Sequence, residues 1–106
     1  MEVNFIVTCF NREKYLPYLV DILKSYSVIK PNILVSYNGK LPYVPCDIRI
    51  PNFGHHQGEC TLIQTAYFCF RAINFCPRFI KVASDTWPLD ETKLVEVFNE
   101  IGRAHV

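Results

Sequence analysis

The chain has 106 residues, which is room for one small domain built around one hydrophobic core. Half of the residues are hydrophobic and 14% are aromatic, so the apolar surface is sufficient for folding and disorder is not expected. Eleven Lys and Arg residues against ten Asp and Glu residues give a formal net charge of +1. This balance argues against a nucleic acid or an anionic membrane surface as the partner.

The apolar pattern of the first third of the chain predicts a strand, a helix and a second strand. Residues 3–8 are rich in β-branched and aromatic side chains, which are typical of a strand. Apolar residues then recur at helical spacing over residues 13–25, with Pro17 in the first turn, where a missing N–H costs least. A second strand is expected over residues 32–37.

The remaining pattern predicts two more strands and two more helices. Residues 47–50 alternate polar and apolar and indicate a half-buried strand suited to a sheet edge. A helix over residues 58–73 leads to a strand over residues 79–83, and a third helix follows Pro88. Strands alternating with helices predict an α/β, Rossmann-like fold, with about four mainly parallel strands flanked by helices.

We expect one domain over residues 1–100, and the last six residues are treated separately. Residues 101–106 resemble the translation of a sequencing adapter, so we predict a non-native tail and exclude His105 from functional reasoning. The alternative is an ordinary polar tail, with Gly102 following the last helix. The third helix has no later strand to lead into, so the domain is expected to be one half of a larger fold.

The cysteines and the chain start indicate the expected compartment. Five cysteines without a CxxC pair argue against a disulfide framework and a zinc site, so we expect buried reduced thiols. No secretory signal and no membrane-spanning stretch is recognisable, and a cytoplasmic location is expected. The cysteines are Cys9, Cys46, Cys60, Cys69 and Cys76.

In open α/β sheets, ligands bind beyond the carboxyl ends of the strands. This rule selects residues 8–12, 36–40, 52–59 and 84–88, which hold most of the polar and glycine residues that interrupt the apolar pattern. Such loops carry function because a rigid sheet holds them in place.

Two of these segments offer polar side chains directly after a strand. Asp85 could hold a divalent cation that neutralises a diphosphate, or it could cap the following turn; spacing alone leaves both readings open. Asn38 could contact a nucleobase or ribose while Gly39 allows close backbone approach. An Asn-Gly turn without a ligand is the commoner use of that dipeptide.

The other two segments offer groups suited to phosphate. Gln57 and Gly58 lie at the expected start of the second helix, where free N–H groups favour a phosphate or a sugar hydroxyl. His55 and His56 are adjacent and point in different directions, so a metal pair is not expected. Arg12, just past the first strand, could pair with a phosphate or be a solvated helix-start arginine.

Four runs, residues 5–12, 33–39, 52–59 and 79–88, together resemble the nucleotide-binding half of GT-A-fold, family 2-like glycosyltransferases. The resemblance covers residues 3–100, in order. It implies a nucleotide-diphosphate sugar donor, a divalent metal (manganese or magnesium), and transfer of the sugar to a saccharide or other hydroxyl acceptor.

Matched onto this family, Thr8 and Phe10 would border the base, Asn38 would contact base or ribose, and Asp85 would hold the metal. The family often shows Asp-x-Asp, whereas Ser84-Asp85-Thr86 supplies one acid, so the metal has weaker support. No residue matches the catalytic base, and the chain by itself is expected to be inactive. The alternatives are a non-catalytic nucleotide- or sugar-binding module, or a nucleotidyltransferase-like domain.

Overall fold

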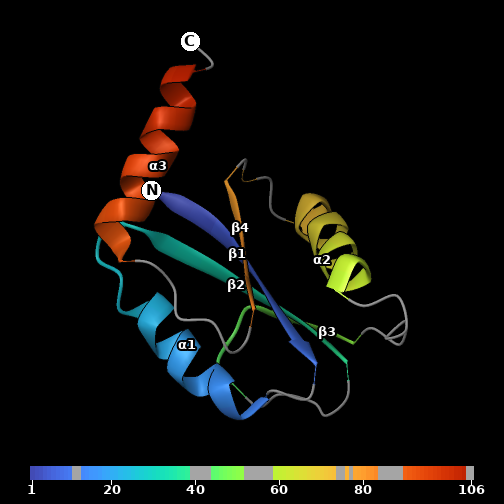
Figure 1. Ribbon diagram of the computed structural model, residues 1–106. Coiled ribbons are helices and arrows are strands. Elements are labelled where there is room, and N and C mark those ends of the chain that lie inside the picture. Colours follow the sequence, from blue (N-terminus) through green and yellow to red (C-terminus); the bar gives the residue numbers. More distant parts are fainter. Residues whose placement is uncertain are drawn as a thin grey trace.

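The computed structural model describes residues 1–10, 13–38, 44–51, 59–73, 76, 78–83 and 90–104, without the side chains of residues 10, 38, 59–62 and 102–104. Within these ranges the chain forms one four-stranded, all-parallel sheet flanked by three helices (Figure 1). The predicted Rossmann-like α/β fold is therefore confirmed.

The four strands lie in the order β3-β2-β1-β4. They are β1 (Glu2–Phe10), β2 (Lys30–Asn38), β3 (Ile48–Pro51) and β4 (Phe79–Ala83). The two central strands extend beyond the predicted limits at both ends, and β4 has the predicted limits. The chain first adds strands on one side of β1 and then crosses to the other side, so the strand order reverses between β1 and β4.

The helices cover both faces of the sheet. A 3-10 turn, η1 (Glu13–Tyr15), leads into α1 (Leu16–Lys24), whose second residue is Pro17 as predicted. α1 lies on the opposite face of the sheet from α2 (Glu59–Ile73), and α3 (Glu91–Ala104) begins on the α1 side (Figure 1). Since both faces are covered, the central strands are apolar at successive positions rather than at alternate ones.

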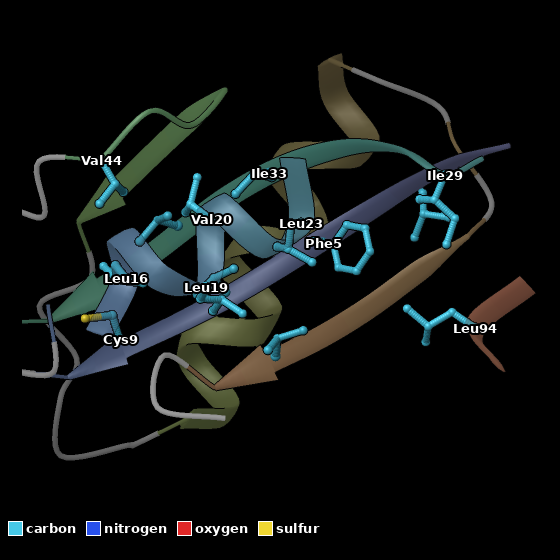
Figure 2. Close-up of a cluster of buried hydrophobic side chains, with 14 residues drawn as sticks. Phe5, Cys9, Leu16, Leu19, Val20, Leu23, Ile29, Ile33, Val44 and Leu94 are labelled. Carbon is cyan, nitrogen blue, oxygen red and sulfur yellow. The ribbon is translucent and has the colours of Figure 1, made fainter. Parts of the chain in front are cut away.

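The larger core lies between the sheet and α1. Odd-numbered positions of β1 and β2 face α1, and Leu94 of α3 reaches the same cluster at the end where Ile29 lies (Figure 2). The side chains that make up this core are at most 7% exposed. They are Val3, Phe5, Val7, Cys9, Leu16, Leu19, Val20, Leu23, Ile29, Ile33, Val35, Val44, Val82 and Leu94.

The smaller core lies between the sheet and α2. Ile6 of β1 and Leu34 of β2 are register partners, and both pack against Ala66 and Phe70 of α2. The Phe70 ring centroid lies 6.3 Å from that of Phe79, at the start of β4. Even-numbered positions of β1 and β2 therefore face α2, and this face carries the candidate site.

The end of the last helix differs from the alternative in which Gly102 follows the helix. The backbone of α3 continues through Gly102 to Ala104, so Gly102 does not end the helix. Residues 101–104 extend a periodic apolar pattern that begins at Leu94, which explains why the helix propagates through a single glycine. No helix in the described ranges combines the length and apolar character that crossing a bilayer requires.

Candidate functional site

The carboxyl ends of the four parallel strands meet at one edge of the sheet, which we call the carboxyl rim (Figure 1). It is formed by the last residues of the strands, Phe10, Asn38, Pro51 and Ala83. This is the edge at which open α/β sheets bind ligands, and the reversal of strand order next to β1 marks the preferred position along it.

The register brings three predicted site residues together at this rim. Phe10 and Asn38 are direct Cα partners at the ends of β1 and β2. Thr8 lies two residues before Phe10 in β1, on the same face of the sheet. It is opposite Ala83 of β4 and is 5% exposed. The backbone geometry expected for a site shared by β1, β2 and β4 is therefore present.

Five predicted site residues, Arg12, Gly39, Gln57, Gly58 and Asp85, lie outside the described residues. Asp85 follows Ala83 by two residues in the sequence. Among the described residues, no group of three or more His, Cys, Asp or Glu side chains is placed to hold a metal ion.

Ser36 lies in the segment 36–40 that the sequence selected, but the sequence reasoning gave this residue no role of its own. It is the register partner of Thr8, and it lies in the same transverse row as Ile50 of β3. Its side chain is 0% exposed, and its Oγ has no hydrogen-bond partner in the described part of the chain. In the sequence, Ser36 could have been noticed as a single hydroxyl residue directly after the apolar run Ile33-Leu34-Val35.

Glu13 is a second residue that the sequence reasoning missed. It is the first residue of η1, three positions after the last residue of β1, and its side chain is half-buried. Its Oε2 is sealed from solvent and accepts no hydrogen bond from any residue the structure describes. A carboxylate at the start of a helical segment interacts favourably with the local N–H dipoles, which offsets part of the cost of burial.

The amino end of α2 lies over the carboxyl rim on the Ser36 face. α2 connects β3 to β4 and runs antiparallel to them, because Tyr67 and Phe70 lie beside Phe79 at the amino end of β4. Ala66 packs over the row of Ile6 and Leu34. The helix rises about 6 Å per four residues, so its first turn reaches the level of the next row outward, that of Ser36.

Four of the five cysteines have described side chains. Cys9 and Cys76 are buried, Cys46 and Cys69 are half-buried, and none of these four forms a disulfide. Burial raises the pKa of the Cys46 thiol, with smaller opposing effects from the Arg49 and Lys24 charges. A raised pKa disfavours the thiolate, so Cys46 is not an activated nucleophile.

Comparison with known proteins adds no assignment to this geometry. No family model, no curated protein and no solved structure matches the chain. The functional argument therefore depends on the fold and on the residues at the carboxyl rim.

Proposed function

We propose that this chain is the nucleotide-sugar-binding half of a GT-A-type glycosyltransferase. The observation that carries the proposal is the register at the carboxyl rim. Phe10 and Asn38 are partners, and Thr8 lies opposite Ala83, two residues before Asp85. The segments that resemble the family's nucleotide contacts thus leave adjacent strands at one edge of the sheet.

The strand order supports the same proposal. β1 lies between β2 and β4, and the order reverses next to it, which is where open α/β sheets bind mononucleotides. In the proposed complex, Asn38 contacts the base or ribose and Asp85 lies on the diphosphate side. Gln57 and Gly58 approach the ligand from the start of α2, and Arg12 pairs with a phosphate.

The proposed metal depends on one protein carboxylate. The described residues provide no three-ligand group, so Asp85 would share the ion with phosphate oxygens and water, as magnesium sites commonly do. A bound metal would stabilise the negative charge of the departing diphosphate. The residues for acceptor activation and sugar transfer are not assigned in this chain.

Calorimetric titration of this chain with UDP and with GDP, each with and without manganese chloride, tests the proposal. We expect one nucleotide to bind, and manganese to tighten that binding. Asp85→Asn should remove the manganese effect while leaving metal-free binding unchanged, because only the metal contact is lost. Asp21→Asn, the same change at an exposed position of α1, is the matched control.

Three results would change the proposal in different ways. Nucleotide binding without any manganese effect would favour the non-catalytic binding module. A manganese effect that survives Asp85→Asn would remove Asp85 from the metal site. Absence of binding to both nucleotides under all conditions would exclude the proposed function.

A further inference from the structure

We propose that the Ser36 hydroxyl and the first turn of α2 together form a phosphate-binding subsite at the carboxyl rim. That the phosphate belongs to a nucleotide rests on the function proposed above. The site itself rests on two independent observations, one on the helix and one on the hydroxyl.

The first observation is the placement of the helix. α2 is 15 residues long, and its amino end lies over the carboxyl rim on the face that carries Ser36. The first four N–H groups of a helix have no partner within it and carry a partial positive charge. Such an end binds phosphate and other anions readily.

The second observation is the state of the hydroxyl. Ser36 is 0% exposed, and its Oγ has neither a donor nor an acceptor in the described part of the chain. Burial of a hydroxyl without a hydrogen bond is unfavourable, and most buried polar groups are paired. A group that is unpaired in the ligand-free chain can gain a hydrogen bond when a ligand supplies the partner.

Position and chemistry together select the ligand class. Ser36 lies in the row just inside Asn38, on the face under the first turn of α2. A hydroxyl on the sheet face that α2 covers and the N–H donors of that helix's first turn together suit an acceptor-rich, negatively charged group. A phosphate offers oxygen acceptors without competing donors. Because Ser36 is sealed in the ligand-free chain, the phosphate reaches the hydroxyl by displacing the atoms that cover it.

Ser36→Ala gives a test with two separate readouts. Without ligand, we expect the melting temperature of the variant to equal or exceed that of the wild type, because no hydrogen bond is lost and a buried polar group is removed. With inorganic phosphate or UMP, we expect the affinity of the variant to fall about 3- to 10-fold, the loss of one hydrogen bond. Uridine, which lacks the phosphate, should bind both proteins equally or not at all.

Ser25→Ala is the matched control. The Ser25 hydroxyl donates to the Ile22 carbonyl oxygen at 2.6 Å, at the exposed end of α1 far from the carboxyl rim. We expect this variant to bind phosphate and UMP like the wild type, and to lose a little stability because a formed hydrogen bond disappears.

Three results would overturn the subsite. A lower melting temperature of ligand-free Ser36→Ala would show that the hydroxyl already has a partner. Equal phosphate affinity in Ser36→Ala and wild type would show that Ser36 does not contact the anion. Failure of phosphate and UMP to stabilise the wild type, against chloride at equal ionic strength, would exclude an anion site.

The two proposals can fail separately. If phosphate binding depends on Ser36 but UDP and GDP bind no better than phosphate, the subsite stands and the nucleotide-sugar function falls. If UDP or GDP binds with manganese and Ser36→Ala binds it equally, the function stands and the subsite falls.

Discussion

The Glu91 carboxylate at the start of α3 accepts a hydrogen bond from the backbone N–H of Ile29, 2.5 Å away and 62 residues earlier in the chain. The same carboxylate accepts the N–H of Val28 at 2.6 Å, and both the N–H and the hydroxyl of Ser27. The N–H groups of three successive residues just before β2 therefore converge on one carboxylate. α3 is attached to the sheet by this contact and by the buried Leu94.

We expect Glu91→Gln to lower the melting temperature at neutral pH, because hydrogen bonds to a charged acceptor are about twice as strong as those to a neutral one. The N–H of Ile29, followed by those of Ser27 and Val28, lowers the pKa of Glu91 below its ordinary value of 4.5, against the opposing effect of burial. The stabilisation is therefore complete above pH 4.5 and is lost as the pH falls through the lower folded-state pKa.

Thermal unfolding of wild type and Glu91→Gln between pH 7 and pH 3 measures this effect. The difference in melting temperature should be constant at neutral pH and should shrink in acid, because Gln does not titrate. Glu96→Gln, at an exposed position of the same helix, is the control and should show neither effect. A difference that does not change with pH would mean that the charge of Glu91 is not what holds α3.

A second prediction concerns the hydrogen-bonded amides of Asn4 and Asn32, near the amino ends of β1 and β2. The Asn32 Nδ2 donates to the Asn4 Oδ1 at 2.9 Å and to the Glu2 Oε1 at 3.0 Å, and Asn4 is 0% exposed. Asn4→Leu should destabilise by about 1–3 kcal/mol, because it breaks the pair and leaves Asn32 with fewer partners.

The double variant Asn4→Leu/Asn32→Leu should lose less stability than the sum of the two single variants. Replacement of both partners by apolar groups of similar shape leaves no unpaired amide. Urea unfolding of the four proteins gives the coupling free energy. Strict additivity would show that the amide hydrogen bond contributes nothing to folding.

The third prediction concerns the core beneath α2. Phe70 is 1% exposed and packs with Ile6, Leu34 and Ala66, so Phe70→Ala should cost about 3–5 kcal/mol through lost burial and the cavity left behind. Phe68→Ala on the same helix removes a side chain that is 59% exposed and should change stability by about 0.5 kcal/mol or less. Equal losses would mean that α2 packs on the sheet through a different face.

Local patterns were sufficient to predict the elements of this fold. The strand over residues 79–83 has its predicted limits, and the described helix Glu59–Ile73 lies within the predicted range 58–73 and ends where predicted. Pro17 lies at the beginning of α1, where its missing N–H is tolerated. These features depend on neighbours within four residues, so the spacing of apolar side chains encodes them directly.

The candidate site itself stays a prediction, and the structure describes only the backbone placement of part of it. The rule that ligands bind at the carboxyl ends of parallel strands predicts a site at the ends of β1 and β2, where the register makes Phe10 and Asn38 neighbours. Glu13 was missed, and Ser36 was given no role within its selected segment, because each is distinguished by a buried oxygen without a hydrogen-bond partner among the described residues. That property depends on everything packed around the atom, which no spacing rule describes.

The sequence by itself therefore determined which segments are strands and helices and that the sheet is mainly parallel. The tertiary structure decided the order β3-β2-β1-β4, the attachment of α3 through Glu91, the Asn4–Asn32 pair and the isolation of the Ser36 hydroxyl. The physical reason is the distance along the sequence between the residues that interact. Periodicity records whether a side chain faces a core, whereas hydrogen-bond partners 28 or 62 residues apart are selected only when the packed elements bring them together.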